Sequence, residues 1–496
     1  MSDNAEATRS LSLVGERVSL PSTSEPGGPA LTDAAAADVP VTSSAVAPGQ
    51  KGAADWGRYG RRPLGVLALV AFVDALDRGI LPGALTEVQD DFGFGDTAAG
   101  FLGTAFVLTG FLVTIPSGYL ADRYRRTRII AVVMASWGVI SALNSVVRSY
   151  GQFLAVRAAL GVGETIDNPS SQSLLADYYP VATRGRAYAY HRILPFVGAA
   201  LGTVLGGVVA ATLGWRWAFL VVGVPGSLLA ILVWRLPEPA RGESDGEVAT
   251  PDQPAREHGL RAMFSDVRVA TSVPTLRSLM VGSAVASGAL AGLGFWAPSF
   301  FERHTSLGTG GGAGLAGVLI LFGALGGTVA GGQITDRIRD RYEGTPMLVA
   351  GVSQFCGALL LMVTFLPIPL YLMLPLQLVA VALIVGGLVA IPVMITEVVP
   401  ASVRGITFSI TGFLSSVASA LSPLMIGFVA ERFARDFDGE TKGDLAKAFL
   451  IMTPLVLIGA VVLLRGRRHV ADDIAAAAAA AHAATTATTA TTVEPS

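Results

Sequence analysis

Charged side chains interrupt stretches of this sequence that are otherwise apolar. The segment VDALDRGIL, residues 73–81, closes an apolar run that begins near Pro63, and it contains Asp74, Asp77 and Arg78. A charge at the centre of a bilayer costs about 2.5–3.5 kcal/mol on insertion scales, so such groups usually face a partner or a water-filled cavity. We therefore treat these three residues as candidates for a functional site.

A second set of charges lies in the apolar segment 151–177. Arg157 and Glu164 are seven residues apart, so on a helix they share one face at a separation of about 10 Å, and Asp167 continues that face roughly one turn further. The residues themselves leave open whether Arg157 and Glu164 form a permanent structural ion pair or a functional one.

Carboxylates and arginines in a partly dry cavity can exchange ion pairs when a carboxylate takes up a proton. Burial favours the protonated form of a carboxylate and a neighbouring arginine favours the ionised form, so protonation becomes coupled to conformation. Such an arrangement is typical of a proton-driven carrier. Asp74 and Arg78, four residues apart, could also pair within their own helix. His191 and Arg192 could bind a charged headgroup, or they could lie close to the membrane surface and extend their charged ends into water.

The composition places the chain among membrane proteins. Hydrophobic residues make up 52% of its 496 positions and charged residues only 15%, with a mean hydropathy of +0.57, whereas a soluble chain carries about 25% charged residues. A single cysteine, Cys356, excludes a disulfide framework and a cysteine-based metal site. The abundance of Ala, Gly and Arg and the scarcity of Lys indicate the coding bias of a GC-rich bacterium.

Twelve apolar segments are each long enough to cross a hydrocarbon core of about 30 Å. Their approximate spans are 63–85, 97–121, 127–146, 151–177, 186–211, 216–236, 276–300, 311–335, 346–366, 371–396, 405–431 and 446–465. The predicted organisation is a disordered tail at 1–55, a six-helix bundle at 56–236, a cytoplasmic linker at 237–275, a second six-helix bundle at 276–468 and a disordered Ala/Thr-rich tail at 469–496.

Arginines gather in the turns after the even-numbered segments. The turn after the second segment carries Arg123, Arg125, Arg126 and Arg128, whereas the turn after the first has acids and no basic residue. Because positive residues stay on the cytoplasmic side, we expect a multi-pass protein of the cell membrane with both termini cytoplasmic. Within the linker, GLRAMFSDVRV at 259–269 predicts a short interfacial helix, with a simple connector as the alternative.

The two halves of the chain repeat each other. GYLADR at 118–123 and GQITDR at 332–337 end the second and eighth segments, and DYYP at 177–180 and EVVP at 397–400 end the fourth and tenth. Each pair is separated by a similar offset, which indicates duplication. Two six-helix halves related by an axis along the membrane normal form an architecture in which a substrate binds near the midplane and the halves rock.

The stretch GYLADRYRRTR at 118–128 resembles the signature after the second helix of the major facilitator superfamily, and GWRWAF at 214–219 is also similar to that superfamily. The resemblance implies an all-α membrane protein of twelve transmembrane helices in two pseudo-symmetric six-helix bundles. A glycine in the signature allows close helix packing, and charges at the helix end can form a breakable interface with the other half. The residues assigned to gating are Gly118, Asp122, Arg123, Arg126, Asp336 and Arg337. An anchor that only fixes topology is the alternative.

The segment 72–106 resembles one branch of that superfamily, the Spinster-like lipid transporters, through its Asp-Arg pair and its later Gly-Phe-Gly-Asp, as does GVGETIDNP at 161–169. The resemblance implies transport of sphingolipid-like or lysophospholipid molecules, with Asp77 and Glu164 carrying protons. The ion-pair partners and headgroup-binding residues are then Arg78, Arg157, Asp74, Asp167, His191 and Arg192.

The charges are unevenly divided between the halves, because segments seven to eleven are almost free of charge through their middles. A headgroup could therefore sit among the N-terminal charges while a tail lies along an uncharged wall. A proton-coupled exporter of hydrophobic compounds and an organic-anion carrier of the same fold remain alternatives. A lipid enzyme is disfavoured because the five histidines do not assemble a catalytic site.

We expect a monomer that handles a lipid-like substrate among membrane lipids, with no nucleic-acid partner, no metal and no cofactor apart from the coupling proton. Two glycine-rich stretches, 202–209 and 323–332, predict either helices that can bend apart or close helix packing.

Overall fold

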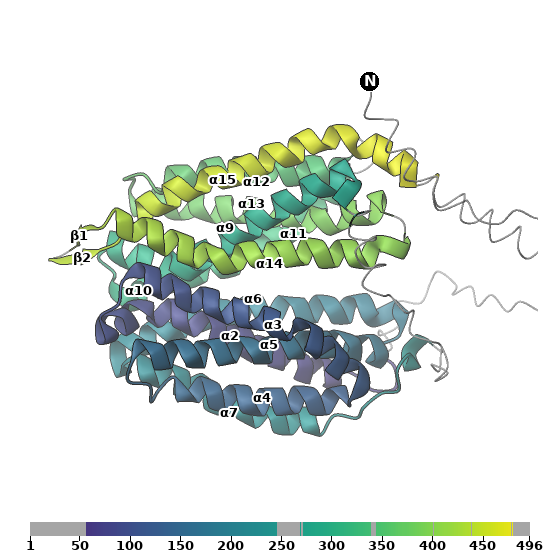
Figure 1. The fold of residues 1–496 in the computed structure, drawn as a ribbon, viewed down its shortest axis with the longest axis horizontal. Helices are drawn as coiled ribbons and strands as arrows, with labels where there is room; N and C mark the ends of the chain where they lie inside the picture. The colour runs from purple at the N-terminus through teal and green to yellow at the C-terminus, as the bar shows by residue number, and fades with distance from the viewer. Residues whose placement is uncertain are drawn as a thin grey trace, which may run out of the picture. The chain divides into compact units, whose positions relative to one another are not determined.

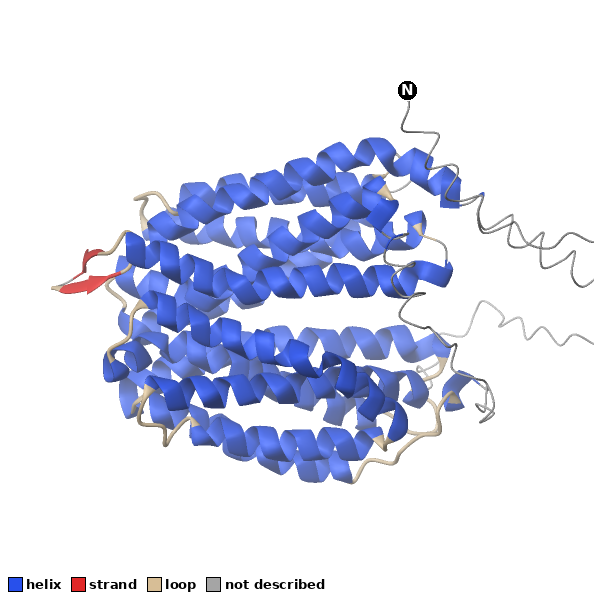
Figure 2. Cartoon of the chain, viewed as in Figure 1, coloured by secondary structure: helices blue, strands red, loops and turns tan. Residues whose placement is uncertain are grey.

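The computed structural model describes residues 56–245, 268, 271–338, 344–399, 401–437, 439–477 and 479. All of them belong to one compact unit, Ala54–Ser496. The described part consists of long helices and one small antiparallel hairpin (Figures 1 and 2).

The N-terminal half contains six long helices. They are α2 (Arg62–Phe92), α3 (Asp96–Arg123), α4 (Arg126–Leu143), α5 (Tyr150–Tyr178), α6 (Val181–Leu213) and α7 (Trp215–Trp234), followed by the short 3-10 helix η1 (Glu243–Asp245). Local signals fix several ends: Gly93 ends α2 in a left-handed conformation with φ 69°. The Ser149 side chain caps α5 by accepting a hydrogen bond from the Gln152 backbone N–H.

The C-terminal half contains a second set of helices. They are α9 (Pro274–His304), α10 (Gly308–Val318), the π-helical turn η2 (Leu319–Gly323), α11 (Ala324–Ile338), α12 (Thr345–Thr364), α13 (Leu370–Val398), α14 (Ala401–Arg432), α15 (Leu445–Gly466) and the 3-10 helix η4 (Arg467–His469). Because α10, η2 and α11 run on without a break, they form one span, Gly308–Ile338. The strands β1 (Arg435–Phe437) and β2 (Glu440–Lys442) pair between α14 and α15, with Arg435 opposite Lys442.

Every predicted apolar segment coincides with a helix or with a continuous helical span. Within the described residues, nine helical segments are long and apolar enough to cross a membrane. The helices α2, α3 and α5 are of similar length, with 31, 28 and 29 residues, but are not among the nine. Charges on α2 and α5 lower the hydropathy of those helices. The predicted count of twelve membrane spans therefore stays a prediction.

Two predicted boundaries differ from the structure or fall outside it. A helix continues from α15 to Ala477, beyond the predicted start of a disordered tail at 469, because the alanine run favours helix. Apart from Arg268, the predicted interfacial helix at 259–269 lies outside the described residues, as do 1–55 and 480–496.

Two pairs of helices make the most extensive contacts between the halves. Helix α3 packs against α14, and α6 packs against α10. In Figure 1 the helices of the N-terminal half gather in the lower part of the view and those of the C-terminal half in the upper part, with α10 beside α6.

Small residues bring helices close together inside each half. A Cβ atom at Gly202 of α6 would overlap the carbonyl oxygen of Leu76 in α2, and one at Gly331 of α11 would overlap the backbone of Gly386 in α13. Of the two interpretations of the glycine-rich stretches, these contacts favour close packing.

Candidate functional site

A cavity of about 490 Å³ lies between helices of the two halves. Helices α2 and α6 line it from the N-terminal half. Pro82 in α2 and Pro195 in α6 are among the lining residues, and each lacks the backbone N–H that would donate a helical hydrogen bond. From the C-terminal half its wall is entirely apolar among the described lining residues and includes Leu290, Leu293, Phe295, Leu319, Val381 and Val385. The predicted uncharged wall is therefore present.

Arg78 is the single charged side chain among the described residues that line this cavity. Its guanidinium Nη2 lies 3.0 Å from the Asp74 carboxylate, one turn earlier on α2. The Arg78 side chain is 41% exposed and that of Asp74 17%. The predicted pair within one helix is confirmed, and the positive charge faces the apolar wall.

Asp77 points away from the cavity. Its side chain is only 1% exposed and accepts a hydrogen bond from the Ser141 hydroxyl of α4. A guanidinium nitrogen of Arg157, on α5, lies 3.9 Å from the other Asp77 oxygen. The predicted meeting of Asp77 and Arg157 is confirmed. Of the two surroundings expected for such a charge, a partner or a water-filled cavity, Asp77 has the partner in this conformation. Consecutive helix residues project about 100° apart, and Arg78 takes the cavity side.

Two aromatic rings lie close to the guanidinium of Arg157. Its guanidinium carbon lies 5.6 Å from the ring centre of Phe106 on α3 and 5.9 Å from that of Phe219 on α7. Such cation–π contacts become stronger when water is excluded, and only 4% of the Arg157 side chain is exposed. A dry compartment inside the N-terminal half therefore holds the Asp77–Arg157 pair.

Asp167, His191 and Arg192 are not among the described residues that line the cavity. Asp167 accepts a hydrogen bond of 3.2 Å from Ser171 within α5. His191 is buried, with no hydrogen-bond partner for Nε2 among the described residues, and Arg192 is exposed. Glu164 belongs to α5, but its side chain is outside the described part.

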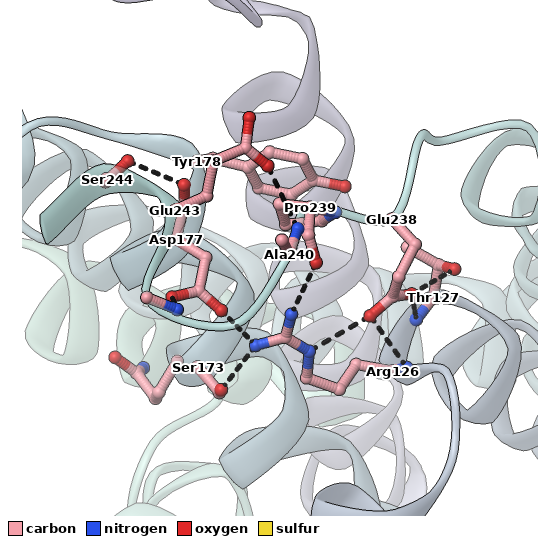
Figure 3. A network of polar contacts seen from close by, with 12 residues as sticks. Arg126, Thr127, Ser173, Asp177, Tyr178, Glu238, Pro239, Ala240, Glu243 and Ser244 are labelled. Carbon is pink, nitrogen blue, oxygen red and sulfur yellow. Dashed lines mark hydrogen bonds and ion pairs between the residues drawn. The ribbon is translucent and has the colours of Figure 1, made fainter. Parts of the chain in front are cut away.

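Arg126 is the centre of a polar network at the start of α4 (Figure 3). Its guanidinium donates to the Asp177 carboxylate and to the Ser173 hydroxyl at 2.7 Å, while its Nε donates to Glu238 at 3.0 Å. The backbone N–H and hydroxyl of Thr127 donate to the same Glu238 carboxylate at 2.9 and 2.7 Å. Burial alone would raise the pKa of Glu238, but these bonds outweigh it and hold that pKa below the usual glutamate range.

In this conformation no described partner of Arg126 lies in the C-terminal half, so its assignment to a gate between the halves stays a prediction. The partners described for Arg126 all belong to the N-terminal half and to the segment after α7, and the Arg126 side chain is 1% exposed. Here it ties α4 to α5 and to the segment after α7. Arg123, Asp336 and Arg337 are exposed, and the burial of Gly118 and Asp122 is outside the described part, so the gating role of these five residues stays a prediction.

A contact between the halves that was not predicted from sequence lies at the hairpin end of the helices. Asp96, in the first turn of α3, forms a two-bond ion pair of 2.7 and 2.8 Å with Arg303, in the last turn of α9. Both side chains are nearly fully buried, and the Gln89 side chain and the Gly443 backbone N–H also donate to the Asp96 carboxylate. The sequence signal was weak: Asp96 closes the Gly-Phe-Gly-Asp motif, and Arg303 is a charge at the end of an apolar segment.

Further polar contacts join the halves at the same end. Thr86 donates to Glu302 at 2.6 Å, and the Thr97 backbone N–H donates to Glu431 at 2.9 Å. Lys442 of the hairpin lies 3.4 Å from Asp90 of α2. The halves are therefore held closed at the hairpin end.

Comparison with known proteins agrees with this architecture. The model of the Major Facilitator Superfamily matches residues 67–423. The chain belongs to the Major Facilitator Superfamily. Membership confirms the predicted fold class and agrees with the expectation of a transporter instead of an enzyme.

Within this superfamily, the chain is similar to Spinster proteins. It is 31% identical to protein spinster of Drosophila melanogaster over 242 residues, which are 47% of this chain and 38% of that protein. It is 28% identical to a probable L-galactonate transporter of Escherichia coli K12 over 166 residues, 34% of this chain and 37% of the relative. The chain thus spans less than half the length of these curated relatives.

Among solved structures of the superfamily, one similar fold is a bacterial homolog of the human lysosomal transporter Spinster, in an inward-facing and unoccupied conformation. Its TM-score is 0.71 at 22% identity, with 85% of this chain and 99% of that chain covered. At this identity the likeness concerns the fold alone. Together with the curated relatives, it confirms the resemblance to Spinster proteins that the sequence indicated.

Proposed function

We propose that this chain is a proton-coupled secondary transporter that moves an amphiphilic lipid, a lysophospholipid or a sphingolipid-like molecule, by alternating access. The observation that carries the proposal is the cavity of about 490 Å³ in which Arg78 faces an apolar wall from the other half. This volume lies within the roughly 300–1,000 Å³ of small-molecule sites. The similarity to Spinster proteins supports the branch, and the lipid class is what the resemblance to Spinster-like lipid transporters implies.

The two sides of the cavity suit the two ends of such a substrate. An anionic phosphate in the headgroup would pair with the Arg78 guanidinium, for which two parallel N–H···O bonds are the favoured geometry. A headgroup that binds there competes with Asp74, which holds Arg78 at 3.0 Å. The tail would lie against Leu293, Phe295 and the other apolar side chains of α9 and α13.

Proton coupling is assigned to Asp77 and Glu164. Protonation of Asp77 removes the negative charge that faces Arg157 at 3.9 Å, so Arg157 is then free to change its ion-pair partner. Because Asp77 and Arg78 are consecutive on α2, a shift of α2 that follows protonation also moves the cavity charge. Proton occupancy and headgroup binding would thereby be linked through one rigid helix.

The orientation in the membrane belongs to the same proposal. The arginine-rich turns support an orientation with the linker and both termini in the cytoplasm of a bacterial cell and the hairpin end outside. The protein would act as a monomer, with the proton as its coupling ion.

Flux measurements in proteoliposomes test the substrate class. We expect labelled lysophosphatidyl lipids to be transported under a pH gradient, and unlabelled lysolipids to compete while simple sugars do not. Absence of lysolipid flux beside strong flux of cationic dyes would refute the proposal in favour of an exporter of hydrophobic compounds.

An organic-anion carrier is the second candidate, favoured by the similarity to the probable L-galactonate transporter and by the positive charge of Arg78. The apolar wall argues against it, because a small sugar acid would leave that wall without a partner. Competition by L-galactonate that is stronger than competition by lysolipids would decide for this candidate.

A further inference from the structure

A second cavity, of about 620 Å³, lies between the first turns of α9 and the end of α15 with η4. Four basic side chains line it: Arg277, Arg465, Arg468 and His469. Among the described residues, it shares no lining residue with the cavity at Arg78. It is therefore a separate feature, at the end of the helices opposite the hairpin.

The three arginines of this basic pocket are available to a ligand. They are exposed, and within the described part of the chain none of them lies within 4.0 Å of a carboxylate oxygen. The Arg468 side chain is held in place by a bond of 3.1 Å from its Nε to the Arg465 carbonyl oxygen. The neighbouring Asp473 is already engaged, because it accepts a hydrogen bond of 3.0 Å from the Thr275 backbone N–H.

An apolar stripe leads away from the pocket along α15. Ile451, Leu455 and Ile458 are exposed and, with Val462 of the pocket lining, recur every three or four residues, so they share one face of the helix. From Ile451 to Val462 the helix rises about 16 Å. This length matches one leaflet, or half of a hydrocarbon core of about 30 Å.

We propose that this basic pocket binds the phosphate of an anionic phospholipid of the surrounding leaflet, with an acyl chain along the stripe on α15. Clusters of arginine at a membrane surface attract anionic lipids, and a phosphodiester is matched by a set of guanidinium donors. The apolar stripe selects a lipid over a free phosphate. The bound headgroup would bridge Arg277 on α9 to Arg465 and Arg468 at the end of α15.

The bridge would act on the transport cavity through α9. The same helix carries Arg277 at its start and contributes Leu290, Leu293 and Phe295 to the cavity wall further along. An anionic lipid that fixes the start of α9 against α15 therefore stabilises one packing of the C-terminal half. This inference holds for any substrate of the transporter.

The experiment compares the full-length protein in nanodiscs of phosphatidylcholine with and without phosphatidylglycerol. Native mass spectrometry counts retained phosphatidylglycerol, and the thermal unfolding midpoint reports its effect. The test variant carries Arg277→Gln, Arg465→Gln and Arg468→Gln. The matched control carries Arg62→Gln, Arg125→Gln and Arg235→Gln, three exposed arginines at the same end of the N-terminal half.

We expect the wild type and the control to retain phosphatidylglycerol and to unfold at a higher temperature in its presence. Each arginine removed should weaken retention about fivefold, so the test variant should lose roughly a hundredfold. If the triple variant unfolds in phosphatidylcholine alone, the single variant Arg277→Gln replaces it in the test, and its retention of phosphatidylglycerol should be about fivefold weaker. Equal retention by test variant and wild type would overturn the proposal, and so would displacement of the lipid by millimolar glycerol phosphate.

Discussion

Asp77 and Arg78 are consecutive residues of α2 that face different surroundings. Asp77 is 1% exposed and lies against Ser141 and Arg157 inside the N-terminal half, whereas Arg78 lines the cavity between the halves. One helix turn thus carries a buried acid on one side and an arginine that lines the cavity on the other. The proposed coupling of proton and lipid rests on this arrangement.

Neutralising Arg78 should weaken substrate binding more than it changes the response to pH. Loss of a charge-assisted hydrogen bond costs about 1.5–3 kcal/mol, so Arg78→Gln should raise KM for a lysophospholipid roughly 10- to 100-fold. Flux measured against substrate concentration at several pH values checks this. Arg78→Lys, which keeps the charge, should recover part of the loss. A KM unchanged in Arg78→Gln would place the headgroup elsewhere.

The buried pair of Asp96 and Arg303 should hold the hairpin end closed. Removing one partner of a buried ion pair costs about 3–5 kcal/mol, so Asp96→Asn should favour opening at that end. For the readout, Cys356 is first replaced by Ser, and Ala297 in the cavity lining is replaced by Cys. The rate at which a membrane-impermeant thiol reagent alkylates this new cysteine is then measured. With Asp96→Asn, we expect the cysteine to be labelled from the hairpin side at least about tenfold faster than in the same protein with Asp96 intact.

The control for this experiment is Asp436→Asn. Asp436 is exposed on the hairpin and accepts a bond from the Gly439 backbone N–H. The substitution Asp436→Asn should leave the labelling rate unchanged. Equal rates for Asp96→Asn and the control would mean that the buried pair does not govern opening.

The Arg126 network should make stability depend on pH through Glu238. Because the pKa of Glu238 is lowered by folding, its stabilising contribution is present above its unfolded value, near 4.5, and is lost as pH falls through the folded value. Glu238→Gln should therefore unfold at a lower temperature than the wild type at pH 7, and the difference should shrink toward pH 4. Thermal unfolding of the wild type and of Glu238→Gln in detergent, at pH 7 and toward pH 4, measures this difference. A difference that grows on acidification would contradict the assignment.

Close packing of α2 on α6 gives a prediction with a control in the same helix. Gly202→Ala would push a methyl group into the Leu76 carbonyl, so the thermal midpoint should fall strongly. Gly185, also in α6, is exposed and has no atom within 4 Å of its Cβ position. Gly185→Ala should raise stability, by up to about 1 kcal/mol, since alanine favours helix. Equal effects of the two substitutions would refute the packing argument.

Hydropathy predicted the helices well because an apolar run that crosses a lipid phase has to satisfy its backbone hydrogen bonds within itself, which a helix does. The predicted 127–146 and 151–177 differ from α4 and α5 by a few residues at most. The Asp74–Arg78 pair was predictable because it depends on spacing within one helix.

The direction of each side chain was not predictable to the same extent. A helical repeat fixes the angle between Asp77 and Arg78, but the neighbouring helices decide which of them meets the cavity. The partners of Arg126 and Asp96 include Glu238 and Arg303, which lie 112 and 207 residues away. Their meeting depends on how whole helices pack, and a local pattern carries no such information.

The most direct test of the account is lysolipid flux driven by a pH gradient in proteoliposomes, for the wild type, Asp77→Asn and Glu164→Gln. We expect both variants to fold in detergent, to bind the lysolipid and to lose the response of flux to the gradient. Flux in both variants with a pH response equal to that of the wild type would contradict the claim that these carboxylates couple proton movement to transport.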